Sequence, residues 1–141
     1  MDNKLLQNVG FLEAKTNIPV LRNSFVSRPR LNNILNDSDK NVYLIHAPAG
    51  YGKTSLLIDY INNKKKKTAW FSIDNCDNSI NIFFYNLCFS INKAEKGIMK
   101  DVLELWSSES KLSIRSMLDI IIDKLSFVDK ELNIVLDDFH Y

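Results

Sequence analysis

Apolar residues in this chain follow two kinds of pattern: short continuous runs, and longer stretches with apolar positions three or four residues apart. Short runs rich in β-branched and aromatic residues are typical of buried strands, and the wider spacing is typical of amphipathic helices. The short runs predict strands over residues 41–46, 68–73 and 132–138. The wider spacing predicts a helix that begins near residue 27, and helices over residues 53–62, 80–92, 98–106 and 113–126.

The order of these elements indicates the fold class. Strands alternate with helices, which is typical of an α/β fold with a parallel sheet and right-handed crossovers. We therefore expect a parallel sheet of about three core strands. Residues 1–26 have scattered apolar positions without a clear period, and we interpret them as an N-terminal arm that precedes a domain over residues 27–141. Ser27 is the expected N-cap of the first helix, with Pro29 in its first turn, and Ser113 is the expected N-cap of the last.

A candidate phosphate-binding loop follows the first predicted strand, where residues 47–54 read Ala-Pro-Ala-Gly-Tyr-Gly-Lys-Thr. Gly50 and Gly52 allow the backbone N–H groups to converge on an anion, and the dipole of the next helix favours the same charge. Lys53 is expected to reach the β- and γ-phosphates, and Thr54 to offer a hydroxyl to Mg²⁺. The residues expected to surround the nucleotide phosphates are Pro48, Ala49, Gly50, Tyr51, Gly52, Lys53, Thr54 and Ser55. An alanine stands where the general motif has its first glycine, so a chance loop before an ordinary helix is the alternative interpretation.

Two carboxylates end the last predicted strand, at Asp137 and Asp138. Ligands of open α/β sheets bind at the carboxyl ends of the strands. We expect Asp137 to hold Mg²⁺, and Asp138 to act with Lys53 in catalysis by orienting or deprotonating an attacking water. The alternative interpretation of the acidic pair is a solvated turn, and the phosphate loop upstream favours the Mg²⁺ role.

Composition limits the classes of function. The chain has 141 residues, of which 45% are hydrophobic and 25% charged, as expected of one globular domain. A net charge of +1 gives no overall attraction to nucleic acid or membrane. No apolar stretch is long enough to span a bilayer, and the N-terminus does not resemble a signal peptide. Cys76 and Cys88 have no metal-ligand spacing and fit a reducing cytoplasm.

Separate segments resemble one known family. They are residues 47–54, Trp70-Phe71-Ser72-Ile73-Asp74 with Asp77-Asn78, Leu136-Asp137-Asp138-Phe139-His140, and the upstream Lys15-Thr16, Ile18-Pro19 and Val26-Ser27-Arg28-Pro29-Arg30-Leu31. Together they resemble the N-terminal ATPase domain of MalT-like large LuxR-type transcriptional activators, which belong to the STAND class of nucleotide switches. Members of that family share the alanine at the start of the loop.

The resemblance implies a three-layer α/β/α P-loop NTPase fold with ATP and Mg²⁺ as cofactors. It also implies that Arg28 lies near the adenine and helps to clamp the nucleotide. Family members continue well beyond the acidic strand, and in their sheets another strand separates the phosphate-loop strand from the acidic one. We therefore expect this chain to be a fragment or a truncated protein. Its first and third strands would then pair directly, or its sheet would contain a gap with unpaired edges.

Three functional hypotheses remain open. The first is the ATP-binding part of a nucleotide switch, with ATP and ADP as ligands, assembly through the ATPase domain, and at most slow hydrolysis. Slow hydrolysis is expected because no arginine that would stabilise the transition state is visible in the motifs. The second is an interaction module or decayed remnant that does not bind nucleotide. The third is a small P-loop kinase, which the few arginines disfavour. Direct DNA binding by this chain is not expected, because it has no helix-turn-helix signature and no basic stripe.

Overall fold

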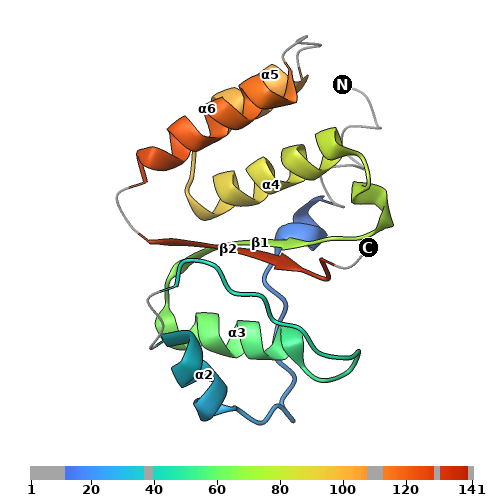
Figure 1. Cartoon of the computed structure of the whole chain (residues 1–141), viewed down its shortest axis with the longest axis vertical. Helices are drawn as coiled ribbons and strands as arrows, with labels where there is room; N and C mark the ends of the chain where they lie inside the picture. Colours follow the sequence, from blue (N-terminus) through green and yellow to red (C-terminus); the bar gives the residue numbers. More distant parts are fainter. Residues whose placement is uncertain (1–11, 37–39, 108–112, 129–130, 140–141) are drawn as a thin grey trace. The chain divides into compact units, whose positions relative to one another are not determined.

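The computed structural model describes residues 12–36, 40–107, 113–128 and 131–139 (Figure 1). The chain divides into two compact units. Unit 1 comprises Met1–Asn17 and Lys67–Tyr141, and unit 2 comprises Ile18–Lys66. The phosphate-loop residues therefore belong to unit 2 and the acidic pair to unit 1.

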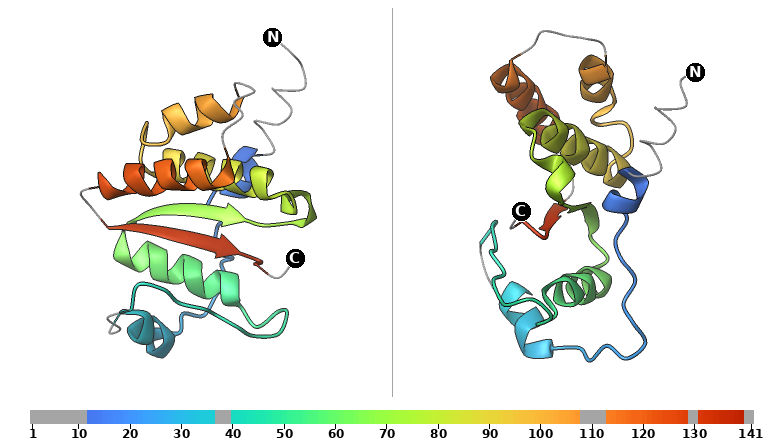
Figure 2. Two further views of the ribbon diagram at one scale, coloured as in Figure 1. Left: turned by 45° about the horizontal axis from the view of Figure 1, so that its top comes forward. Right: turned by 90° about the vertical axis from the view of Figure 1, so that its right-hand side faces the viewer.

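A two-stranded parallel sheet forms the centre of unit 1. Strand β1 (Lys67–Ser72) pairs with β2 (Leu132–Asp137) in a register that begins with Lys67 opposite Leu132 and ends with Ser72 opposite Asp137. Figure 2 shows the two strands side by side and pointing in the same direction. Ala69, Trp70 and Phe71 of β1 are almost fully buried. Both strands confirm their predictions from the apolar runs, and the parallel sheet confirms an α/β fold.

Helices cover one face of this sheet (Figure 1). A short 3₁₀ turn, η1 (Asn75–Asp77), follows β1 and leads into α4 (Ile80–Ala94), which contacts β1. Helix α5 (Lys100–Ser107) packs on α4, and α6 (Ile114–Ser126) packs on α5. The core cluster consists of Ala69, Cys88, Ile91, Met99, Val102 and Ile121. All three helices were predicted, and each lies within a few residues of its expected range.

Unit 2 is built from two helices and the extended segment between them. Helix α2 (Pro29–Asn36) contacts α3 (Lys53–Lys64), and both confirm the predicted helices. The predicted cap of α2 is wrong. The carbonyl of Arg28 accepts the first helical hydrogen bond, from the Asn32 N–H at 3.2 Å, so Arg28 is the N-cap. The hydroxyl of Ser27 instead donates to Asp59.

The predicted strand over residues 41–46 is also wrong. In the described residues only β1 and β2 form a ladder, and residues 42–48 have no regular secondary structure. Val42 is 86% exposed and Leu44 is 90% exposed. An apolar run becomes a buried strand only when a neighbouring strand pairs its backbone groups, and none of the described residues supplies that pairing. The expectation of about three core strands is thus corrected to two for the described part of the chain.

Among the described residues, none of the helices has the length and apolar character needed to cross a membrane.

Candidate functional site

Two left-handed glycines shape the loop between the extended segment and α3. Gly50 and Gly52 adopt left-handed conformations, with φ of 80° and 77°. Residues with a Cβ rarely adopt such angles, so the loop requires glycine at these positions. Gly52 is the N-cap of α3 and has no side chain with which to cap the first-turn N–H groups. The amino end of α3 carries the positive end of the helix dipole, a position at which proteins commonly bind anions.

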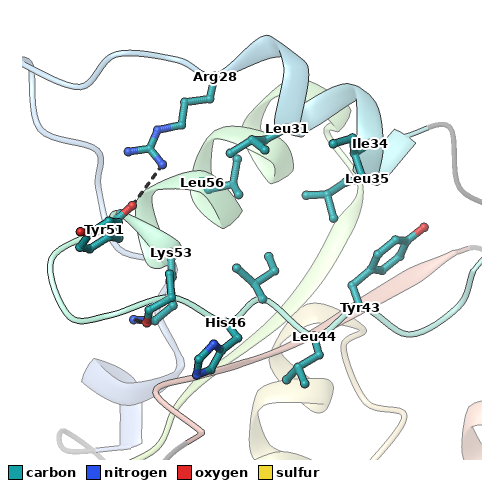
Figure 3. Close-up of a pocket in the computed structure, with 13 residues that line it drawn as sticks. Arg28, Leu31, Ile34, Leu35, Tyr43, Leu44, His46, Tyr51, Lys53 and Leu56 are labelled. Carbon is teal, nitrogen blue, oxygen red and sulfur yellow. Dashed lines mark hydrogen bonds between the residues drawn. The ribbon is translucent and has the colours of Figure 1, made fainter.

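Lys53 folds back over this loop. Its ammonium group donates to the Ala47 carbonyl at 3.0 Å and to the Pro48 carbonyl at 3.2 Å. Figure 3 shows the lysine side chain among the residues that line a cavity beside the loop. A phosphate would offer this cation stronger, charge-assisted hydrogen bonds than the two neutral carbonyls do. Thr54 and Ser55 follow in the first turn of α3 and are half-buried.

Arg28 reaches the loop from the turn before α2. Its Nη1 donates to the Tyr51 carbonyl at 3.1 Å, as the dashed line in Figure 3 shows. A Cβ built on Gly52 would lie 3.5 Å from the Arg28 Nη2, so the guanidinium lies close to the second glycine of the loop. The structure thus brings the predicted residue Arg28 together with the predicted phosphate loop. The predicted contact of Arg28 with adenine stays a prediction.

A largely apolar cavity of about 360 Å³ adjoins the loop within unit 2. Its lining includes Leu31 and Leu35 from α2, Tyr43 and Ile45 from the extended segment, and Lys53 (Figure 3). Its volume lies at the lower end of the range found for small-molecule pockets in proteins. The sequence had indicated one apolar face on α2 but not the hollow that this face encloses, because the hollow depends on where residues 43–46 lie.

Asp59 is a site residue that sequence reasoning missed. It is a buried carboxylate on α3, and its Oδ2 accepts hydrogen bonds from the Ser27 hydroxyl at 2.7 Å and the Asn32 amide at 2.6 Å. The Asn63 amide donates to its Oδ1 at 3.3 Å. Through these hydrogen bonds, Asp59 connects Ser27 and Asn32, which lie on either side of Arg28 in the sequence, to α3, the helix that begins at the loop. The only signal in the sequence is a single acid among the apolar positions of α3.

The predicted acidic residues lie at the carboxyl end of β2 in unit 1. Asp137 is buried, and its carbonyl accepts a hydrogen bond from the Ile73 N–H at 3.0 Å. Asp138 follows in an exposed turn with φ of 58°, a left-handed conformation that Asp adopts more readily than most residues. No group of three or more His, Cys, Asp or Glu gathers as a metal cage in the described parts of the chain. Mg²⁺ at phosphate sites needs no such cage, because phosphates and water fill most of its ligand positions. The shared Mg²⁺ role of Thr54 and Asp137, and the catalytic role of Asp138, stay predictions.

A second polar cluster, around Lys15, is buried in unit 1 at the end of β1. The Lys15 ammonium pairs with Asp77 and lies 3.0 Å from the Asp74 carboxylate. Asp77 also accepts a bond from the Asn86 amide at 2.7 Å. Partial burial alone would raise the pKa of Asp74, but hydrogen bonds from Lys15 and from the Cys76 backbone, with the attraction of Lys15, hold that pKa below its usual value. The sequence had marked Lys15, Asp74 and Asp77 only through the family resemblance.

Comparisons with known proteins agree with the motifs. A family model described as "Nephrocystin 3, N-terminal" matches residues 22–139. The HTH-type transcriptional regulator MalT of Vibrio parahaemolyticus is 28% identical over 131 residues, which make up 92% of this chain and 14% of that protein. The serine/threonine-protein kinase PknK of Mycobacterium tuberculosis is 30% identical over 121 residues, or 83% of this chain and 11% of that protein. The similarity to MalT confirms the likeness that the motifs indicated, and the chain spans only a small part of each relative.

Proposed function

The chain belongs to the family described as Nephrocystin 3, N-terminal, and we propose that it is the nucleotide-binding part of a regulatory switch that takes ATP and ADP with Mg²⁺. One observation carries the proposal. A loop with two left-handed glycines leads into the uncapped amino end of α3, and Lys53 lies folded over that loop. Backbone N–H groups, a helix dipole and a mobile cation are together suited to a polyphosphate.

The apolar cavity beside the loop supports a nucleoside triphosphate over inorganic phosphate as the ligand. A base and ribose would take the apolar space beside Tyr43 and Leu35, with the phosphates on the loop. The cavity adjoins the loop directly, since Gly52 and Lys53 belong to its lining.

The proposed metal site uses few protein groups. In this proposal the Thr54 hydroxyl is a ligand of Mg²⁺, Asp137 has a role in holding Mg²⁺ through water, and Asp138 has a role in orienting an attacking water. When bound, Mg²⁺ neutralises phosphate charge. The proposed fold for this role is the three-layer P-loop NTPase arrangement.

The proposed activity is binding with at most slow hydrolysis of ATP to ADP and phosphate. MalT is named as a transcriptional regulator and PknK as a protein kinase. The chain spans 14% of one and 11% of the other, so a role as the switch region of a longer regulator is part of this proposal. The proposed consequence of ATP binding is self-association of that region.

The first test is calorimetric unfolding of the chain with and without Mg-ATP. Ligand at one hundred times its dissociation constant should stabilise the protein by about 2.7 kcal/mol, which corresponds to a rise in midpoint of about ten degrees. Lys53→Ala should remove the rise. Lys64→Ala is the matched control, because Lys64 is an exposed lysine at the far end of the same helix, and it should keep the full rise.

The opposite result would decide between hypotheses. A cooperative transition that Mg-ATP does not move would reject nucleotide binding and favour the interaction module or remnant. The exposed side chains of Val42 and Leu44 would then be the first surface to examine for a partner.

A further inference from the structure

The peptide between Tyr51 and Gly52 is the point at which Arg28 meets the phosphate loop. A trans peptide holds its C=O and N–H on opposite sides, and the described residues contain no cis peptide. The bond from Arg28 to the Tyr51 carbonyl therefore also fixes the direction of the Gly52 N–H. That N–H is one of the groups expected to cradle phosphate.

In the absence of the hydrogen bond from Arg28, a glycine at position 52 would allow this peptide to rotate. Gly52 has φ of 77°, and glycine populates both signs of φ with similar ease. The N–H of Tyr51 bonds weakly to the Pro48 carbonyl at 3.4 Å, and Gly50 on the other side of Tyr51 is also left-handed. A rotation of this peptide would turn a carbonyl oxygen toward the anion and would repel it.

The segment that carries Arg28 is connected to α3 through the buried carboxylate of Asp59. Ser27, on one side of Arg28, and Asn32, one turn into α2, both donate to Asp59 Oδ2. Asp59 lies on α3, the helix whose first turn forms the end of the loop. The start of α2 is thus bonded to α3, the helix that follows the loop. From the start of α2, the Arg28 side chain reaches the Tyr51 carbonyl in the loop.

Resting on the proposed function, we propose that Arg28 is a positioning residue that acts through the Tyr51–Gly52 peptide, independently of the base. Its guanidinium keeps the Tyr51 carbonyl turned outward and the Gly52 N–H turned toward the phosphates. Loss of Arg28 lowers the binding affinity for every ligand that carries the phosphate chain, and it does so by the same factor.

The test compares Mg-ATP with Mg-tripolyphosphate, which has the phosphates without a nucleoside. Isothermal titration of the wild-type chain and Arg28→Ala should show a loss of about threefold to tenfold for both ligands, as expected for one exposed hydrogen bond. A loss for ATP alone would mean that Arg28 contacts the nucleoside, and it would overturn the proposal. An unchanged affinity for both ligands would overturn it as well.

Selective ¹⁵N-glycine labelling separates positioning from direct phosphate contact. The chain has four glycines, so the spectrum is simple. In Arg28→Ala without ligand, the Gly52 amide signal should broaden through exchange between two peptide orientations, whereas Gly97, which belongs to unit 1, should be unaffected. A sharp Gly52 signal in the ligand-free variant would show that the loop is already fixed, and it would overturn the proposal. Restoration of a sharp signal by Arg28→Lys would show that one cationic donor is enough.

Failure of the proposed function would give a different set of binding results from failure of the role of Arg28 alone. If Lys53→Ala abolishes binding of both ligands while Arg28→Ala changes neither, only the role of Arg28 is rejected. If the folded wild-type chain binds neither ligand, nucleotide binding and the role of Arg28 are rejected together.

Discussion

Lys15 shows how much one buried charge can contribute to this fold. Its side chain is 7% exposed and the Asp77 carboxylate is 1% exposed, so both ions depend on each other for solvation. Lys15→Met would leave Asp77 uncompensated, and we expect a loss of about 3–5 kcal/mol in the free energy of unfolding. Urea unfolding followed by tryptophan fluorescence measures this, because Trp70 and Trp106 both lie in the same unit as Lys15.

The matched control is Lys93→Met. Lys93 also bonds to the segment around residues 13–17, through Glu13 and Asn17, but it does so at the surface. Exposed pairs contribute about 0–1 kcal/mol, so this variant should be nearly as stable as the wild type. Equal losses in the two variants would contradict the distinction between the buried and the exposed pair.

Asp74 adds a pH dependence to the same cluster. Its folded pKa lies below the unfolded value of 3.8, so its contribution is present above pH 3.8 and is lost as the pH falls through the folded pKa. We expect the stability difference between the wild type and Lys15→Met to shrink on acidification, and the part due to Asp74 to be lost as the pH falls below 3.8 and through the folded pKa of Asp74. Urea unfolding at a series of pH values measures the difference. A difference that grows on acidification would contradict the assigned cause.

At the scale of elements, two serines that precede helices show what a local pattern can predict. Ser113 is the expected cap of the helix over 113–126, and its hydroxyl accepts the Ser116 N–H at 3.1 Å. Ser27 has an equally suitable position in the sequence, but its hydroxyl donates to Asp59, on a different helix. The first interaction is local and was predictable, whereas the second depends on how α2 packs on α3 and was not.

The cap of α6 gives a prediction for this element. Ser113→Ala removes the acceptor for a first-turn N–H and should cost about 0.5–2 kcal/mol of stability. Ser126→Ala at the other end of α6 is the control, because the Ser126 hydroxyl only donates to the Asp123 carbonyl on an exposed turn. Chemical denaturation should place Ser126→Ala within about 0.5 kcal/mol of the wild type. A cost for Ser126→Ala as large as that for Ser113→Ala would contradict the capping assignment.

Across the whole molecule, predictability follows the range of the interactions. The strands at 67–72 and 132–137 and the run at 41–46 have similar apolar sequences, but among the described residues only the first two form a strand ladder. Strand pairing is a long-range property that a run of residues cannot reveal by itself. The same holds at the site. Gly50, Gly52 and Lys53 could be predicted from one short motif. The Arg28 contact with Tyr51 and the hydrogen bonds of Asp59 could not, because they join segments that are distant in the sequence.

The two cysteines provide a test of the core on which unit 1 depends. Cys76 is exposed on η1, whereas Cys88 of α4 is fully buried among Ala69, Ile91 and Met99, and burial raises the pKa of its thiol to about 12. Because only the thiolate reacts, an aromatic disulfide reagent near pH 8 should label one thiol of the native protein quickly. The second thiol should react only at the rate at which unit 1 opens, and in denaturant both should react at once.

Cys76→Ser identifies the two phases of this labelling. It should remove the fast phase and leave the slow one, whose rate should rise with urea in step with the tryptophan signal, because both report on unit 1. Unit 2 contains no cysteine, so its opening does not contribute to the labelling. Two fast thiols in the native wild-type protein would mean that α4 does not pack on β1 and α5 as described. A slow Cys88 would establish that unit 1 has a cooperative core even though its sheet has only two described strands, because a loosely packed helical layer would admit the reagent without unfolding.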